Sequence, residues 1–165
     1  MTIVKRVELF WKIVEKIFYW LSVLCLGGMT FLIFLQVIFR YVFKLPLAWT
    51  EELSRFLFIW MTFTAGVVAA KQGQHIGVGL IVEMMPSIGR RVAGIFGNAV
   101  SAVFFGIVSN YCIIQWGRLD SQRSPALLLP MSYVYLGIIL GSVFMGLYYL
   151  WSAIALSLLK NEEGT

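Results

Sequence analysis

Long apolar segments alternate with short polar stretches along the whole chain. A helix needs about 20 consecutive apolar residues to cross a bilayer, and three of the segments reach that length without a charged residue. The remaining segment has only residues 56–70 free of charge, so the charged turn that precedes it must lie at the membrane interface or against protein. We therefore predict four membrane spans, over residues 17–43, 51–70, 92–117 and 132–159.

The first sixteen residues have a different pattern. Apolar side chains recur at helical spacing against a face of charged residues, which predicts an amphipathic helix. Such a helix can lie in the plane of the lipid headgroups, or it can simply extend the first span. The pattern leaves both alternatives open.

The stretch from Gln36 to Trp60 brings two spans together at a turn rich in charged and aromatic residues. Pro46 interrupts the helical pattern, and Thr50 is placed to cap a new helix. The helix dipole favours the negative charge that Glu51 and Glu52 bring to the first turn.

Charged residues near this turn are spaced for pairing within a helix. Arg55 lies four residues after Glu51 and three after Glu52, so it can pair with either carboxylate. Gln36 and Arg40 share a face of the preceding span in the same way. Aromatic residues between the two spans are typical of interfacial anchors; they are Tyr41, Phe43 and Trp49.

Composition places the chain among integral membrane proteins. It is 60% hydrophobic and 13% charged, with a mean hydropathy of +0.86, far from the soluble average. The fold class we predict is all-α integral membrane, in one membrane domain. The net charge of +5 comes with no basic run, so we expect no nucleic-acid partner. Cys25 and Cys112 fall inside apolar segments and are expected to pack there as small residues.

The distribution of lysine and arginine predicts the topology. Cytoplasmic loops carry an excess of these residues. One side of the predicted membrane holds Lys5, Arg6, Lys12, Lys16, Lys71, Arg90, Arg91 and Lys160, and the other side holds Arg40, Lys44, Arg55, Arg118 and Arg123. The larger group lies on the side of both termini, which we therefore expect to be cytoplasmic.

Three stretches of the chain resemble a known family. They are QVIFRYVFKLPLAWTEELSRFLFIW, HIGV with the Pro86 that follows it, and SPALLLPMSYVYLGIILG. They look like the small four-helix membrane subunit, the Q subunit, of tripartite ATP-independent periplasmic (TRAP) transporters. The most specific part of the resemblance is the register of Arg40, Tyr41, Leu47, Trp49, Glu51, Glu52 and Arg55.

The resemblance implies a multi-pass protein of the inner membrane of bacteria or archaea. Its partners would be a large membrane transport subunit, a periplasmic substrate-binding protein and the lipid bilayer. Transport in that family is driven by a sodium gradient, with substrates that are mostly organic acids. The small subunit would be no enzyme and would hold no cofactor, and the sodium ions would belong to the large subunit.

The charged residues of the turn have two interpretations. A charge in a membrane span marks a functional site by default, because an unpaired buried charge is costly. Arg40, Glu51, Glu52 and Arg55 could line a path for cations or carboxylates. We favour the other interpretation, an ion-pair network that joins two helices or docks the large subunit, because the charges are balanced in sign. The residues that we assign to partner binding or to a structural ion-pair network are Gln36, Arg40, Trp49, Glu51, Glu52 and Arg55.

His75 is the only histidine of the chain and stands in a glycine-rich loop. A metal site needs several clustered donors, and no other histidine, cysteine or aspartate lies near it in the sequence. We expect His75 to anchor the loop rather than to bind a metal.

Two other functions compete with a transporter scaffold. A small self-assembling proton or cation antiporter would use Glu51 or Glu52 as its carboxylate. Both lie at a helix start beside Arg55 rather than alone in mid-span, which argues against this function. A haem-binding redox subunit is disfavoured because one histidine cannot supply two axial ligands.

Overall fold

The computed structural model describes residues 2–73 and 87–158 of the chain. Nearly all of these residues are helical, as their apolar composition requires inside a bilayer, where a helix satisfies its own backbone groups. The helices are α1 (Thr2–Tyr41), α2 (Ala48–Lys71), α4 (Ser87–Ile114), α5 (Trp116–Ser121) and α6 (Met131–Leu158).

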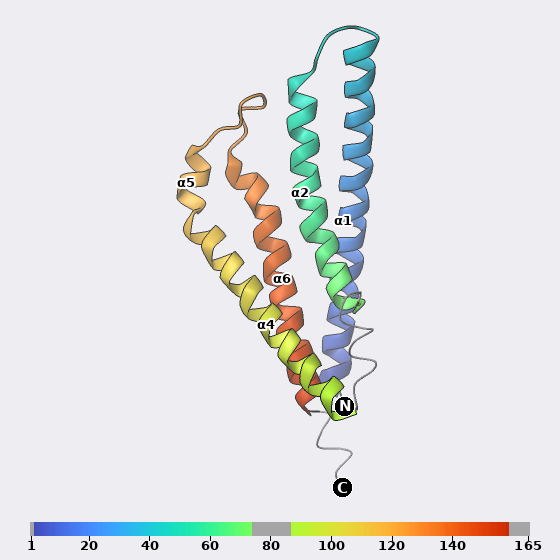
Figure 1. The fold of residues 1–165 in the computed structure, drawn as a ribbon, viewed down its shortest axis with the longest axis vertical. Helices are drawn as coiled ribbons and strands as arrows, with labels where there is room; N and C mark the ends of the chain where they lie inside the picture. The colour runs from blue at the N-terminus through green and yellow to red at the C-terminus, as the bar shows by residue number, and fades with distance from the viewer. Residues whose placement is uncertain (1, 74–86, 159–165) are drawn as a thin grey trace.

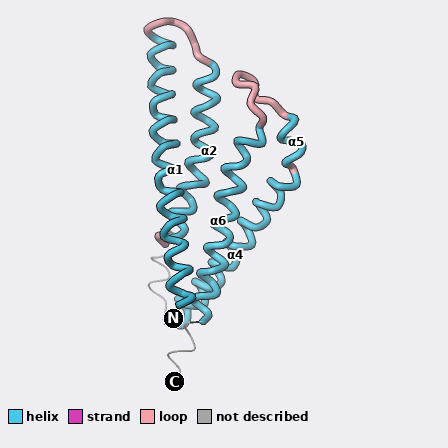
Figure 2. The backbone as a smooth tube through the Cα atoms, turned by 180° about the vertical axis from the view of Figure 1, so that it is seen from behind, coloured by secondary structure: helices cyan, strands magenta, loops and turns pink. Residues whose placement is uncertain are grey.

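The long helices form two hairpins (Figure 1). One hairpin is made of α1 and α2, and the other of α4, α5 and α6. Helix α2 packs on α1 along one side and on α6 along the other, and α4 packs on α6. The hairpins lie together where the chain begins and ends, and they diverge toward the opposite side in both views (Figures 1 and 2). We call these two sides the terminal end and the loop end.

Four of the helices are long and apolar enough to cross a membrane: α1, α2, α4 and α6. This confirms an all-helical protein with four spans. The N-terminal amphipathic stretch continues α1 without a break, so in this structure it extends the first span rather than forming a separate helix.

The buried core lies in the terminal half of the molecule, where α1, α2 and α6 meet. Trp11 packs edge-on against Tyr148 with ring centroids 5.0 Å apart, and Phe18 packs on Phe144 at the same separation. The buried members of the cluster are Trp11, Val14, Phe18, Val67, Val68, Ala70, Met145 and Tyr149.

Two glycines let α6 approach α2 closely. A Cβ atom placed on Gly141 would lie 2.6 Å from the Cβ of Phe63 and 2.7 Å from its carbonyl oxygen. A Cβ atom on Gly137 would lie 2.8 Å from the ring of Trp60. Small residues at a membrane helix interface permit this kind of backbone contact. The α2 and α6 pair therefore depends on these positions having no side chain.

The structure differs from the sequence prediction at two boundaries. The third span ends at Ile114 rather than at residue 117, and the short helix α5 lies across the predicted end of that span. Helix α2 begins at Ala48, with Leu47 as its N-cap residue and no side-chain cap. Thr50 is therefore not the cap: it lies inside the first turn and donates a hydrogen bond to the Leu47 carbonyl at 2.8 Å.

Candidate functional site

The pair predicted between Glu51 and Arg55 forms at the loop end. Arg55 Nη2 lies 3.0 Å from Glu51 Oε1, one helical turn apart on α2. Both side chains are more than half exposed, at 68% for Arg55 and 53% for Glu51. Exposed pairs of this kind stabilise a helix by only a few tenths of a kcal/mol, about 0.3–0.5. This ion pair lies within α2 and therefore does not link α2 to another helix.

Glu52 has a different partner from the one expected. Its Oε2 accepts hydrogen bonds from the backbone N–H groups of Ala126 at 2.9 Å and Leu127 at 2.8 Å. These residues lie in the segment that connects α5 to α6. A carboxylate that accepts two N–H groups makes strong, charge-assisted bonds. Glu52 thus ties the first hairpin to the second at the loop end, where the helices otherwise diverge.

The connecting segment is folded around Ser124, which is 1% exposed. Ser124 N–H donates to the Leu129 carbonyl at 2.9 Å, and Leu129 N–H donates to Ser124 Oγ at 3.2 Å. Leu128 stands at the tip with a φ of 54°, a conformation that costs energy for a residue with a side chain. The hydrogen bonds on both sides of Leu128 hold it in this conformation.

The other predicted residues of the turn are not brought into a network. Arg40 is exposed, Gln36 is half-buried, and their side chains form no hydrogen bond or ion pair within residues 2–73 and 87–158. Trp49 is 40% exposed near the start of α2. His75 lies outside the described residues. The structure therefore unites Glu51 with Arg55 and Glu52 with the second hairpin, and leaves Gln36, Arg40 and Trp49 at the surface.

The terminal end holds a polar cluster that the sequence pattern did not predict. Lys71, the last residue of α2, forms an ion pair with Glu15 of α1, and both side chains are largely buried. Gln72 donates to the same carboxylate at 3.1 Å. Tyr148 of α6 donates to the Lys71 carbonyl at 3.3 Å. Three helices meet at this cluster.

A second set of polar contacts joins α4 to α6 at the same end. Arg91 donates to the Leu156 carbonyl through Nε at 3.1 Å and Nη2 at 2.6 Å. The last carbonyls of a helix lack partners within the helix, and a nearby cation satisfies them. Asn98 also donates to Ser152 Oγ at 3.0 Å. The two long helices of the second hairpin are thus fastened at the terminal end by side chains far apart in the sequence.

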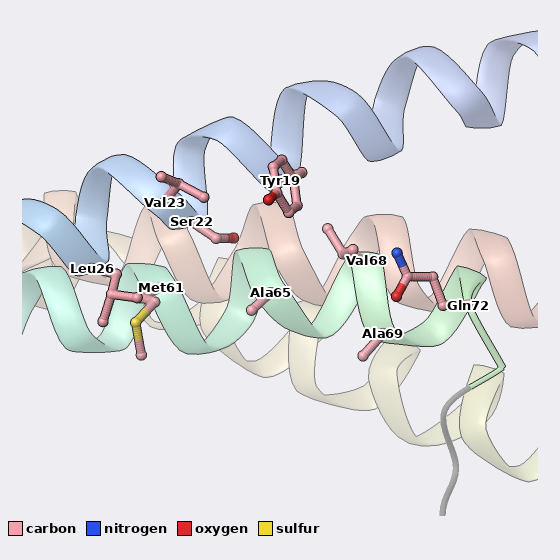
Figure 3. Close-up of a pocket in the computed structure, with 9 residues that line it drawn as sticks. All are labelled: Tyr19, Ser22, Val23, Leu26, Met61, Ala65, Val68, Ala69 and Gln72. Carbon is pink, nitrogen blue, oxygen red and sulfur yellow. The ribbon is translucent and has the colours of Figure 1, made fainter.

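An apolar groove of about 350 Å³ runs between α1 and α2 (Figure 3). Small residues form part of its lining, including Ser22, Ala65 and Ala69. Ser22 also donates to Thr64 Oγ1 at 2.9 Å, which holds the two helices together beside the groove. The groove offers few polar groups, so it suits an acyl chain or an apolar helix rather than a polar substrate.

Within the described part of the chain, no three histidine, cysteine, aspartate or glutamate side chains are grouped so that they could hold a metal ion. Cys25 and Cys112 are free thiols on different helices. The site residues therefore offer hydrogen bonds and charge for protein contacts, and we find no arrangement for nucleophilic chemistry among them.

Comparison with known proteins identifies the family. A sequence model described as "Tripartite ATP-independent periplasmic transporters, DctQ component" matches residues 29–159. A protein of Haemophilus influenzae assigned as a TRAP transporter small permease protein is 28% identical over 128 residues, which are 76% of this chain and 80% of that protein.

Two further relatives carry substrate names. The C4-dicarboxylate TRAP transporter small permease protein DctQ of Rhodobacter capsulatus is 32% identical over 103 residues, 60% of this chain and 44% of that protein. The isethionate TRAP transporter permease protein DctMQ of Oleidesulfovibrio alaskensis is 31% identical over 120 residues, 64% of this chain but only 18% of that protein. With the family match over four spanning helices, this multi-pass membrane chain belongs to the tripartite ATP-independent periplasmic transporters as a DctQ component, the small permease subunit.

Proposed function

We propose that this chain is the non-catalytic small subunit of a sodium-coupled secondary transporter that takes organic acids from a periplasmic binding protein. It would scaffold the large transport subunit in the inner membrane of a bacterium or archaeon. It would also help to form the periplasmic face on which the binding protein docks. The observation that carries the proposal is the family match over most of the bundle.

The length of one relative supports the proposal that this chain has a large membrane partner. The isethionate permease protein aligns with 64% of this chain, yet the aligned part is only 18% of its own length. A segment like this chain is therefore joined to a much longer permease in that protein. We infer that the present chain meets the corresponding permease as a separate subunit.

The surface of the bundle supports the same inference. In the most apolar 18-residue stretch of α4 only 6% of the residues are buried, against 22% in α2 and in α6. Much of the apolar surface of α4 therefore faces lipid or another protein. A carrier that moves polar substrates by itself needs a polar path through the membrane. The polar contacts between helices instead serve to join the helices, which fits a scaffold.

The test is sodium-driven uptake of organic acids into proteoliposomes. Three preparations would be compared, each with the binding protein: this chain alone, the large subunit alone, and the two together. We expect uptake only from the pair, and only with an inward sodium gradient. Uptake by this chain alone, or by the large subunit alone at the rate of the pair, would contradict a scaffold that transport requires.

Glu52 offers a sharper test of the scaffold. Changing Glu52→Ala removes the acceptor that holds the Ala126–Leu127 backbone, so the two hairpins should lose this link at the loop end. We expect a several-fold lower recovery of the two-subunit complex on affinity purification. Glu51→Ala is the matched control, since the one side-chain partner of Glu51 among the described residues is Arg55 of the same helix. Equal recovery from both variants would rule out a role of Glu52 in assembly.

A further inference from the structure

A pocket of about 440 Å³ lies at the terminal end between α1 and α6. Helix α2 stops at Lys71, whereas α1 continues beyond that level, so the pocket opens past the end of α2. Its lining is more polar than that of the groove in Figure 3. The residues that matter for its chemistry are Glu8, Trp11, Lys12, Lys71, Trp151 and Ser152.

The length of α2 sets the depth of this pocket in the membrane. With 24 residues at about 1.5 Å each, α2 is about 36 Å long. The hydrocarbon core is about 30 Å thick, and the bilayer with its headgroups about 40–45 Å. Lys71 therefore lies near the boundary of the hydrocarbon, and Glu15 lies beside it. The headgroups add about 5–7.5 Å on each side of the hydrocarbon. Lys12, about 5 Å further along α1, therefore lies among them, and Glu8, about 10 Å further, lies at their outer edge.

Two of the three charged residues that line the pocket, Glu8 and Lys12, are available to a ligand. Glu8 and Lys12 are four residues apart on α1, and both are exposed. Among the side chains that the structure describes, they form no ion pair with each other or with a third residue, although the spacing permits one. Lys71, by contrast, is already paired with Glu15. The pocket thus offers one free cation and one free carboxylate within the described part of the chain.

Neutral groups of the pocket complete the pattern. Ser152 Oγ accepts from Asn98, so its own hydroxyl proton is left to donate. Trp11 and Trp151 border the pocket with large amphipathic rings, which favour the level of the headgroups. A ligand that fits must carry a negative group, a positive group and an apolar part next to them.

We propose that this pocket binds the headgroup of a phospholipid that carries a primary amine, with its phosphate at Lys12 and its ammonium group at Glu8. Phosphatidylethanolamine has this chemistry and lies at the required depth. The lipid would lie against the faces of α1 and α6 that line the pocket. Nothing in this inference depends on the transport function, since it concerns the chain and the bilayer alone.

The test measures lipid bound to the purified full-length chain. The protein would be incubated in mild detergent with phosphatidylethanolamine or with phosphatidylglycerol, which lacks the amine, and bound lipid would be counted by native mass spectrometry. We expect one retained phosphatidylethanolamine, held several-fold better than phosphatidylglycerol. Equal retention of the two lipids would overturn the assignment of the amine to Glu8.

Three variants separate the two contacts. Lys12→Gln should lower the retention of both lipids several-fold, whereas Glu8→Gln should lower only that of phosphatidylethanolamine, to the level of phosphatidylglycerol. Lys16→Gln is the matched control, because Lys16 is also an exposed lysine of α1 but lines a different groove with Ile13 and Ile17. Unchanged retention in both pocket variants, or an equal loss in the control, would overturn the proposal.

Two further arms distinguish a lost contact from a misfolded protein, and a lipid from free phosphate. Lys12→Arg keeps the positive charge and should restore retention, which a misfolded protein would not do. Displacement of the lipid by millimolar inorganic phosphate would show a site for free phosphate and would overturn the lipid as ligand. We expect no displacement, because the lipid also holds the site through its acyl chains.

Discussion

The two ends of the first hairpin both carry an acidic and a basic residue in contact, but the contacts differ in kind. At the loop end, Glu51 and Arg55 belong to one helix and are more than half exposed. At the terminal end, Glu15 and Lys71 belong to two helices, and their side chains are only 25% and 20% exposed. The first pair can only support α2, whereas the second fixes α1 against α2. Position between helices, rather than charge, decides which pair holds the bundle together.

The glycines of α6 and α4 also differ in whether they lie at a contact between helices. Gly137 and Gly141 of α6 lie against side chains and backbone of α2, whereas added Cβ atoms on Gly97 and Gly106 of α4 would meet nothing within 4 Å. Both sets form stripes of small residues in the sequence. Among these four glycines, only Gly137 and Gly141 need the absence of a side chain for helices of the described chain to pack.

The largest effect is expected at Gly141. Gly141→Ala would place a methyl group within 2.7 Å of the Phe63 carbonyl oxygen, and the backbone there cannot move aside as a side chain could. Overpacking of this kind costs about 1–3 kcal/mol. We expect a clearly lower midpoint of unfolding by denaturing detergent. Gly97→Ala is the control and should be neutral or slightly stabilising, because its methyl group meets open space. Equal midpoints for the two variants would refute the close packing of α2 and α6.

A smaller effect is expected for the pair between helices. Lys71→Met removes the cation and leaves the Glu15 carboxylate partly buried with Gln72 as its remaining donor. The loss of a bond to a charged group costs about 1.5–3 kcal/mol, and the partial exposure of this pair places it at the lower limit. The measurement is the unfolding midpoint of both single variants and of the double variant with Glu15→Gln. The double variant should lose less than the sum of the singles, and strictly additive losses would show that the pair is not coupled.

The smallest effect is expected for the pair within α2. Glu51→Ala should lower the stability by no more than about 0.5 kcal/mol, because an exposed pair one turn apart is weak and screened by salt. The same unfolding assay applies, at low and at high salt concentration. A loss as large as that of Lys71→Met would mean that Glu51 contacts more than Arg55.

Much of the fold follows from local pattern. The four spans, their order and the pairing of Glu51 with Arg55 depend on residues close together in the sequence, and periodicity and spacing describe such relations well. The residues at which helices begin and end are predicted less well, because small differences in free energy decide them. The chain forms α5 across the predicted end of the third span, and Thr50 lies inside a helix rather than at its cap.

Contacts between helices could not be predicted in the same way. Glu15 and Lys71 are 56 residues apart, and Glu52 reaches a backbone 74 and 75 residues away. One weak signal existed for the first pair. Glu15 precedes the first span and Lys71 closes the second, so two adjacent antiparallel spans place opposite charges at the same level. The sequence holds no such signal for the contact of Glu52, because its partners are backbone N–H groups, which almost every residue has.

The length of α1 has a consequence for the water on one side of the membrane. Its 40 residues make a rod about 60 Å long, at about 1.5 Å per residue. Even at a tilt of about 40°, the upper limit for spanning helices, such a rod extends about 46 Å along the bilayer normal, beyond a bilayer of about 40–45 Å. At smaller tilts α1 extends still further beyond the bilayer. The backbone of the first turn of α1, ahead of Glu8, therefore stands in the water, within reach of soluble molecules on that side.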